Sequence, residues 1–158
     1  MKTELVMHWM SHEPITVTPG TGLHDAHDIL RKYGIRRLPV VDKNGKLVGI
    51  VTRGDIREAS PSDVTSLTVW EINYLLTKLK IKEIMTPHPI TVYTTDTITK
   101  AAKFMLENKI SGLPVVDPVD GALKGIITES DIFRLVVQTW DRTEVEEVEL
   151  VRKEKILL

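Results

Sequence analysis

The chain has 158 residues, of which 42% are hydrophobic and 27% are charged, and its formal net charge at pH 7 is -1. These values exclude a disordered chain, and the near-neutral charge gives no basic field that would hold nucleic acid or anionic lipid. The absence of cysteine excludes disulfides, thiolate zinc sites and a cysteine nucleophile, and fits a reducing cytoplasm. Met1–Met10 lacks the pattern of a signal peptide and no apolar run approaches the ~18 residues of a membrane span, so we expect a cytoplasmic protein with no membrane partner.

The segment from residue 15 to about residue 60 predicts alternating short strands and helices. A strand, Ile15–Val17, leads into a helix whose apolar residues recur at three- and four-residue spacing and which Gly34 would end. Two apolar strands, Leu38–Val41 and Leu47–Thr52, flank an Asn-Gly turn that favours a tight hairpin, and a closing helix follows. The predicted order is β-α-β-β-α, in the α/β (α+β) class.

The next predicted element is a helix from about Val64 to Leu79. Its apolar residues cover more than the single stripe that one packing face needs. The helix therefore either caps the domain or also contributes to a subunit interface, where Trp and Tyr are enriched. The sequence leaves both interpretations open.

The first set of elements returns in the second half, because three blocks of sequence recur 75 or 76 positions later. The recurring pairs are Met10–Val17 with Met85–Val92, Ile35–Asp42 with Ile110–Asp117, and Leu47–Ile56 with Leu123–Ile132. Strands that are apolar on both faces need cover that one unit of this length cannot provide, whereas two copies packed sheet to sheet would provide it. We expect repeats at residues 5–60 and 81–139, a helical linker at 61–80 and a tail of unknown role at 140–158.

Each repeat carries a Gly-Ile-Val/Ile-Thr-x-x-Asp-Ile motif, Gly49–Ile56 and Gly125–Ile132. One interpretation is a capping box, in which the Thr hydroxyl and the Asp carboxylate bond to backbone N–H groups at a helix start. The other is a ligand site, because a helix N-terminus suits phosphate and an acid one turn further on can accept the hydroxyls of a ribose. The recurrence of Asp in both copies favours binding, and the spacing alone leaves both interpretations open.

The segment before the Leu-Pro-Val-Val-Asp strand differs between the copies. It reads Gly34-Ile35-Arg36-Arg37 in the first and Lys109-Ile110-Ser111-Gly112 in the second. Adjacent arginines could hold phosphate oxygens, or they could form a solvated basic turn. The first copy also has Arg53 where the second has Glu129, so we expect the first copy to suit a polyphosphate better.

Metal binding and catalysis find little support in the sequence. The pairs His24 with His27 and His8 with His12 could each supply two metal ligands, but a third is not evident. No Gly-x-Ser-x-Gly, Walker or Gly-x-Gly-x-x-Gly motif occurs. We expect neither a metal site nor an enzyme.

Taken together, these motifs resemble a tandem pair of CBS domains, the module named after cystathionine β-synthase. The resemblance covers residues from about 5 to 139 and rests on the Ile-Thr-Val segments, the Leu-Pro-Val-Val-Asp strands and the two Thr-x-x-Asp motifs. The linker, through Arg57–Asp63 and Val69–Leu76, further resembles bacterial CBS proteins of the acetoin-utilisation type.

The resemblance implies repeats related by a pseudo-two-fold axis, a homodimer, and clefts between the repeats for adenosine compounds. By position, Asp55 and Asp131 would hold ribose hydroxyls, and Thr52 and Thr128 would meet phosphate. The nucleotide-binding residues implied are Ile15, Thr16, Ile35, Arg36, Arg37, Pro39, Thr52, Gly54, Asp55, Ile90, Thr91, Lys109, Ile110, Ser111, Gly112, Pro114, Thr128, Ser130 and Asp131.

We therefore expect a non-catalytic regulatory or sensor module that binds AMP, ADP or ATP, requires no cofactor, and acts on an enzyme or transporter partner. Two alternatives remain: a structural dimerisation module with empty clefts, and a binder of S-adenosylmethionine or NAD. An enzyme and a nucleic-acid binder are weaker hypotheses.

Overall fold

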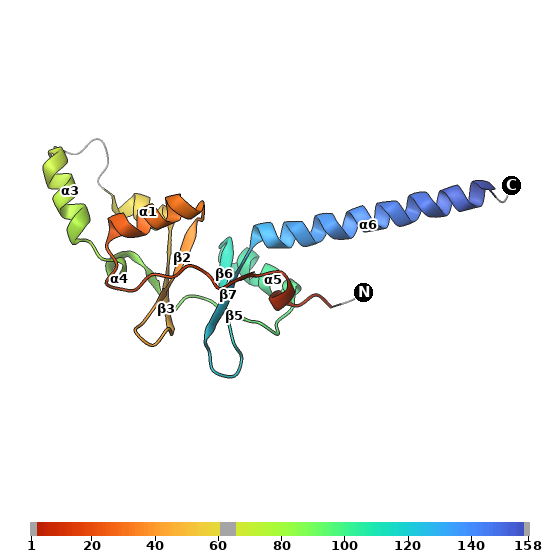
Figure 1. Ribbon diagram of the computed structural model, residues 1–158, viewed down its shortest axis with the longest axis horizontal. Helices are drawn as coiled ribbons and strands as arrows, with labels where there is room; N and C mark the ends of the chain where they lie inside the picture. Colours follow the sequence, from red (N-terminus) through yellow and green to blue (C-terminus); the bar gives the residue numbers. More distant parts are fainter. Residues whose placement is uncertain (1–2, 61–65, 157–158) are drawn as a thin grey trace.

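The computed structural model describes residues 3–60 and 66–156, which form two similar α/β units and a long C-terminal helix (Figure 1). The first unit holds a 3-10 helix Val6–His8, β1 Ser11–His12, α1 Leu23–Tyr33, β2 Arg37–Val41, β3 Leu47–Thr52 and α2 Arg53–Ala59. After α3 Val69–Lys78, the second holds α4 Ile81–Ile84, β4 Thr86–Pro87, β5 Val92–Tyr93, α5 Ile98–Asn108, β6 Gly112–Val116, β7 Leu123–Thr128 and α6 Glu129–Ile156. The predicted mixed α/β class is confirmed.

The equivalent helices α1 and α5 both end at a residue with a left-handed backbone conformation. In α1 the buried residues Leu23, Ala26 and Leu30 share one face, and the helix ends at Gly34, whose φ of 62° is the left-handed conformation that glycine adopts without strain. Its counterpart α5 ends at Lys109, a non-glycine residue with a φ of 53°.

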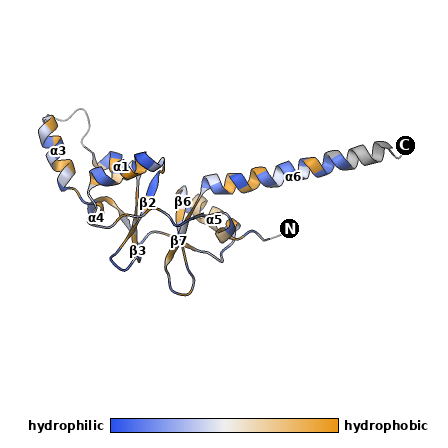
Figure 2. Ribbon diagram, viewed as in Figure 1, coloured by the Kyte–Doolittle hydropathy of each residue, from blue (hydrophilic) through white to orange (hydrophobic). Residues whose placement is uncertain are grey.

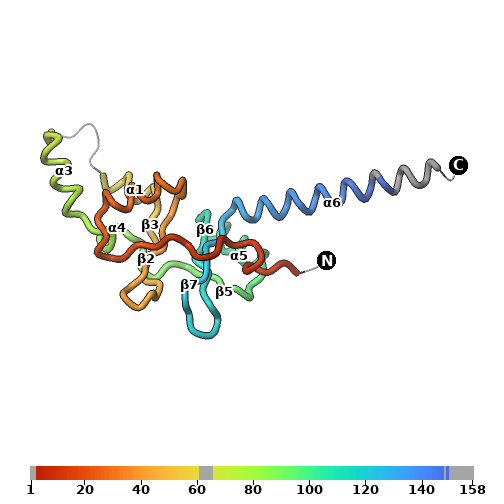
Figure 3. The backbone as a smooth tube through the Cα atoms, in the orientation of Figure 1, coloured from red at the N-terminus to blue at the C-terminus, as the bar shows by residue number. Residues whose placement is uncertain are grey.

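The two sheets are built by exchange between the units. Strand order is β1-β7-β6-β5 in one sheet and β2-β3-β4 in the other. The N-terminal strand β1 therefore pairs with β7 of the second unit, while β4 pairs with β3 of the first. Figure 3 shows the N-terminal segment running from beside α5 across to the first unit. Each unit thus donates its leading segment to the sheet of the other.

The predicted strand Ile15–Val17 is wrong in extent. Only Val17 joins the sheet, as an isolated parallel bridge to Val40, whereas the counterpart β5 forms a two-residue strand. The Thr21 N–H donates to the Thr18 carbonyl, so the chain turns after Val17 and the pairing does not continue beyond it.

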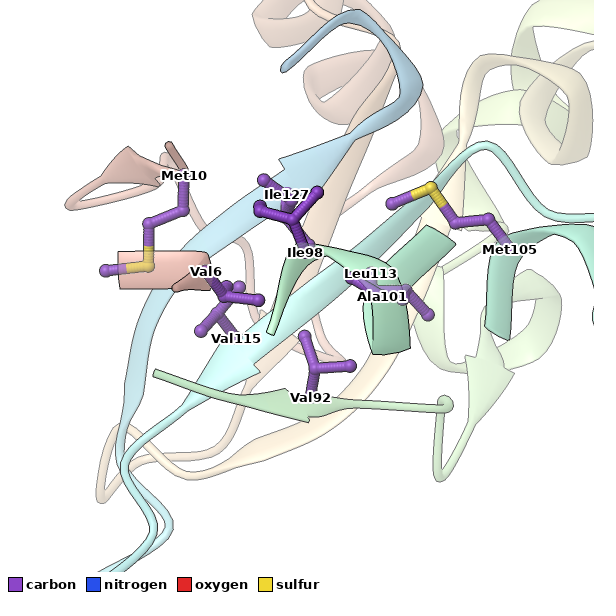
Figure 4. Close-up of a cluster of buried hydrophobic side chains, with 9 residues drawn as sticks. All are labelled: Val6, Met10, Val92, Ile98, Ala101, Met105, Leu113, Val115 and Ile127. Carbon is purple, nitrogen blue, oxygen red and sulfur yellow. The ribbon is translucent and has the colours of Figure 1, made fainter. Parts of the chain in front are cut away.

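The buried side chains form two clusters, and each includes apolar residues from the donated segment. Val6 and Met10 lie in the second unit's cluster with Leu113, Val115 and Ile127 (Figure 4). Ile81, 75 positions after Val6, lies in the first unit's cluster in the same way. Burial of a side chain of this size is worth about 1.5–3 kcal/mol, so the exchange contributes directly to the stability of both units.

Gly49 and Gly125 make room for the donated segments. A Cβ at Gly125 would lie 2.5 Å from the Ser11 carbonyl oxygen and 2.7 Å from Met10 Sδ. A Cβ at Gly49 would lie 2.5 Å from Met85 Sδ. These glycines of the recurring motif are therefore required by the close approach of the neighbouring strand.

The linker helix α3 begins at a capping box in which the Glu71 N–H donates to Thr68 Oγ1 and the Thr68 N–H donates to Glu71 Oε2. The bond from the backbone of Thr68 holds the pKa of Glu71 below its usual value.

Leu76 and Leu79 pack against the buried cluster of the first unit, so the helix does cover the domain, while the Trp70 side chain is 86% exposed. The start predicted at Val64 lies outside the described residues.

Helix α6 continues the closing helix of the second unit far beyond the point where α2 ends in the first (Figure 1). The tail predicted from residue 140 is thus a continuation of this helix as far as Ile156. Hydrophilic and hydrophobic residues alternate along it (Figure 2). None of the helices in residues 3–60 and 66–156 has the length and apolar character needed to cross a membrane.

Candidate functional site

Two clefts lie between the repeats, and both repeats line each of them. The first, of about 450 Å³, combines the N-terminal and arginine segments of repeat one with the end of β7 and the start of α6. Its lining is Ser11, His12, Glu13, Pro14, Ile15, Gly34, Ile35, Arg36, Arg37, Ser111, Ile126, Thr128, Glu129 and Ser130. The second, of about 350 Å³, is lined by Arg37, Ile50, Thr52, Asp55, Thr86, Pro89, Ile90, Lys109, Ile110, Ser111 and Gly112.

This pairing corrects the charges expected from the sequence. The expectation placed Arg53 with the arginine pair and Glu129 with Lys109, because residues were grouped by repeat. In the structure Glu129 lines the first cleft with the arginines, while Arg53 lines neither cleft. The expectation for Glu129 was wrong because β7 ends beside the leading segment of repeat one. Arg53 does lie beside the arginine pair, since its N–H donates to the Arg36 carbonyl at 2.9 Å.

In repeat one the Thr-x-x-Asp motif is a capping box at the start of α2. The Asp55 N–H donates to Thr52 Oγ1 at 3.1 Å, and the Thr52 N–H donates to Asp55 Oδ2 at 2.7 Å. Asp55 is half-buried and lines the second cleft. Among the described residues no partner bonds to its Oδ1, so one carboxylate oxygen can meet a ligand there.

In repeat two the carboxylate of the same motif is buried. The carboxylate of Asp131 accepts from the Thr128 N–H and Oγ1, both at 2.9 Å, and from Arg134 Nη1 at 3.0 Å. Asp131 is only 4% exposed and does not line the first cleft. A ligand that used it would first have to displace Arg134, whose side chain is 59% exposed.

Arg37 connects the two clefts, because it lines both of them. Its guanidinium donates to the backbone carbonyl and the hydroxyl of Ser111, and it occupies the space that a Cβ on Gly112 would need. Burial, followed by the charge of Arg36, holds the pKa of Arg37 below its usual value, and Glu129 opposes that shift. The sequence indicated that the arginines belong to one site. In the structure Arg37 lines both clefts.

The structure brings most of the predicted binding residues into the clefts and leaves six of them outside. Pro39 and Pro114 are buried at the centres of β2 and β6, where no cleft reaches them. The six residues that line neither cleft are Thr16, Pro39, Gly54, Thr91, Pro114 and Asp131.

Several lining residues were not predicted, although the sequence held a signal for them. Ser11–Pro14 and Thr86–Pro89 belong to the first recurring block, so their recurrence could have marked them. Ile50 and Ile126 stand two residues before the motif threonines, and residues two apart on a strand share a face.

The histidines form no metal site within the described part of the chain, where no group of three or more His, Cys, Asp or Glu side chains converges. His24 Nε2 instead lies 3.3 Å from Asp28 Oδ2 on the exposed side of α1.

The first cleft thus offers apolar contacts from Ile15 and Ile35 beside two guanidinium groups, with the acids Glu13 and Glu129 also in its lining. Such a surface fits a ligand with a flat apolar ring and an anionic end. The second cleft offers Ile90 and Ile110 beside Asp55, Lys109 and the shared Arg37, which fits a ligand with both hydroxyl groups and an anionic end.

Comparison with protein families matches a CBS domain model to residues 5–62 and 81–138. A CBS domain-containing protein of Dictyostelium discoideum is 35% identical over 85% of this chain and 92% of its own length. Uncharacterized protein MJ1225 of Methanocaldococcus jannaschii is 35% identical over 84% of this chain, which spans 47% of that protein. The chain also spans 23% of an L-aspartate semialdehyde sulfurtransferase of the same organism, at 37% identity over 83% of this chain.

Solved structures of similar chains are CBS pairs. The CBS domain pair of protein MJ0100, in complex with 5'-methylthioadenosine and S-adenosyl-L-methionine, has a TM-score of 0.72 at 36% identity, covering 87% of this chain and 99% of that one. CBSX2 of Arabidopsis thaliana in complex with AMP has a TM-score of 0.72 at 31% identity, covering 86% and 98%. A putative acetoin utilization protein from Vibrio cholerae has a TM-score of 0.72 at 29% identity, covering 90% and 97%.

Proposed function

Because the chain belongs to the CBS domain family, as a tandem pair of these domains, we propose that it is a non-catalytic regulatory module that binds adenosine nucleotides in its two clefts. The observation that carries this proposal is the first cleft, where Ile15 and Ile35 stand beside Arg36 and Arg37. The similar chains bound to AMP and to S-adenosyl-L-methionine support the same ligand class.

The two clefts contact a nucleotide through different side chains. In the first, the arginines hold the phosphate of AMP, ADP or ATP and the isoleucines contact the adenine. In the second, the free oxygen of Asp55 accepts from ribose hydroxyls, and Lys109 and Arg37 are the cations beside it. Asp131 reaches a ribose only when Arg134 moves aside.

Regulation requires that the ligand bind one arrangement of the repeats more tightly than another. Arg37 is placed to provide that difference, because a phosphate that attracts its guanidinium competes with Ser111 of the other repeat. The module acts in the cytoplasm, as a homodimer, on an enzyme or transporter partner.

The proposal is tested by calorimetric titration and thermal unfolding of the chain with AMP, ADP, ATP, S-adenosylmethionine and NAD. A ligand at 100 times its Kd stabilises the folded state by about 2.7 kcal/mol. Asp55→Ala should weaken binding at one of the two sites, and Glu107→Ala, an exposed acid on α5, is the matched control. If no adenosine compound at millimolar concentration shifts the Tm, the proposal fails.

A second candidate function is a structural dimerisation module, favoured by the exposed apolar side chains of α3. Val69 is 72% exposed, Trp70 86% and Tyr74 58%. In that case Trp70→Ala should convert a dimer to a monomer in sedimentation equilibrium, while the nucleotides above would change neither the Tm nor the oligomeric state.

A further inference from the structure

Helix α6 extends well beyond the unit that it closes, and Figure 1 shows it leaving both units as a single rod. Its 28 residues span about 42 Å at 1.5 Å per residue. Ile132 and Leu135 pack against the buried cluster of the second unit, whereas every residue from Val137 to Glu147 is exposed. We call residues 137–156 the α6 arm. A lone helix of this length is only marginally stable in water, so a packing partner would stabilise the arm.

The α6 arm has apolar residues at the spacing of a helix–helix contact. Val137 and Trp140 are 54% and 67% exposed and stand three positions apart. Continuing in steps of three and four, the helical register assigns Glu144, Val148 and Val151 to the same face. Hydrophilic and hydrophobic residues follow one another along the helix in Figure 2. An apolar stripe with a charged residue within it is typical of a helix that packs on another helix and selects its partner.

The charges of the α6 arm are separated along its length. The segment Glu144–Glu149 has four acidic residues and no basic one, whereas residues 152–155 read Arg-Lys-Glu-Lys. The helix dipole favours basic residues in the last turn, which accounts for the second segment. It does not account for the first, because the dipole favours acids within the first turn, and these acids lie in the second half of α6.

The acids cannot be neutralised within their own helix. Residues three or four positions apart are neighbours on a helix surface, and no basic residue stands at either distance from Glu144 or Glu147. These two glutamates are themselves three positions apart, so they repel each other. Lys155 likewise has no acid at these distances and stands three positions from Arg152. The charges of the arm are therefore matched by a second helix that carries the opposite order of charge.

We propose that the α6 arm binds the α6 arm of a second copy of this chain, side by side and antiparallel. A two-fold axis between positions 149 and 150 matches the acidic segment of each arm with the basic segment of the other, and each pair forms twice. The same register sets Val148 of one arm opposite Val151 of the other. The matched charges are Glu144 with Lys155, Glu146 with Lys153, and Glu147 with Arg152.

The charges also select the orientation of the two arms. In a parallel pair each acid would lie beside the same acid of the other copy, and each base beside the same base, which is repulsive. The proposal does not rest on nucleotide binding, because of the residues of α6 only Glu129 and Ser130, at its start, line either cleft. Adenosine compounds should therefore leave the pairing of the arms unchanged.

The first test is sedimentation equilibrium of the full chain with charge-reversal variants. Glu146→Lys/Glu147→Lys and Arg152→Glu/Lys153→Glu should each raise the Kd of self-association about tenfold or more, because each change replaces attraction by repulsion at four pairs. An equimolar mixture of the two variants should associate as wild type does, since every reversed charge then meets its opposite. Lys43→Glu/Lys46→Glu, at exposed positions between β2 and β3, makes the same change of net charge as the second variant and is the matched control.

The second test measures the orientation directly, because the chain has no cysteine and an introduced one is unique. With a short bismaleimide, Glu144→Cys chains should cross-link to Lys155→Cys chains, and neither variant should cross-link to itself. Self-linked chains would show a parallel pair and overturn the proposal. Reversal variants that associate as tightly as wild type, or a mixture that associates no better than its components, would also overturn it. Glu147→Gln replaces the first reversal variant should that protein not fold, and it too should weaken self-association.

Discussion

The two repeats share the residues that meet backbone requirements and differ in the residues around the clefts. Gly49 and Gly125 both make room for a crossing segment, and in both repeats the motif threonine's N–H donates to the carboxylate of the motif aspartate. Around them, repeat one has arginines where repeat two has Ser111, Gly112, Glu129 and Phe133.

The shared positions are those that the fold requires, and the differing positions are those that it leaves free. A glycine under a crossing strand and a Thr-Asp pair at a helix start meet backbone requirements, so both copies keep them. Positions that face the clefts meet no such requirement, and there the copies have become chemically distinct. Four measurements test which of these positions the fold requires.

The largest effect is expected at the crossing glycines, and it should be unequal. Gly125→Ala would press against the Ser11 backbone carbonyl, which moves only if β1 moves, so a loss of about 2–3 kcal/mol in unfolding free energy is expected. At Gly49 the nearest atom is the flexible end of Met85, and a loss of about 1 kcal/mol is expected. Urea unfolding followed by circular dichroism measures both.

The control for the crossing glycines is Gly20→Ala, since no atom lies within 4 Å of a Cβ built there. Its unfolding free energy should stay within about 0.5 kcal/mol of wild type. Equal losses of unfolding free energy at Gly49 and Gly125 would show that the two donated segments move aside equally easily.

The next effect distinguishes the two motif acids. Asp131 is buried and accepts three hydrogen bonds, so Asp131→Ala should cost about 2 kcal/mol. The half-buried Asp55 accepts one, and Asp55→Ala should cost about 1 kcal/mol. The same urea titrations decide the order, and a larger loss for Asp55→Ala would contradict the burial argument.

A smaller effect is expected where Arg37 crosses to repeat two. Arg37→Ala removes its bonds to Ser111 and should cost about 1 kcal/mol. Gly112→Ala should cost a similar amount, because the new methyl group displaces the guanidinium. The double variant should cost clearly less than the sum, since both changes remove one contact. Strict additivity would mean that Gly112 is needed for another reason.

The smallest effect concerns Glu129, one of two acids that line the first cleft. Glu129→Gln removes a negative charge beside the bound phosphate, and AMP affinity should rise about two- to fivefold. The gain should shrink in high salt, because exposed charges are screened. An affinity that falls, or a gain that does not depend on salt, would place the phosphate away from Glu129.

Most of the helices and strands of the first repeat could be predicted from the sequence, because the signals for them are local. Periodic apolar residues marked α1, and Gly34 marked its end. The apolar runs marked β2 and β3, and the motif Thr52–Asp55 marked a helix start with the predicted capping box. The repeat extended each of these predictions to the second half.

The assembly of the clefts could not be predicted in the same way. Periodicity says which residues form a strand but not which strand pairs with it, so the pairing of β1 with β7 left no trace in the pattern. That pairing decides that Glu129 lines the first cleft together with Arg36. The burial of Asp131 depends on Arg134, whose equivalent in repeat one is Glu58, and no recurring motif contains either residue.

The exchanged segments also set an order of events during protein synthesis. The first cluster is complete once Ile81 has left the ribosome, but Val6 and Ser11 must wait for β7, whose residue Ile126 pairs with Ser11. At the usual elongation rates of about 5–20 residues per second, that wait lasts on the order of ten seconds. The segment that contains Val6 and Ser11 is therefore made long before the strand with which it pairs.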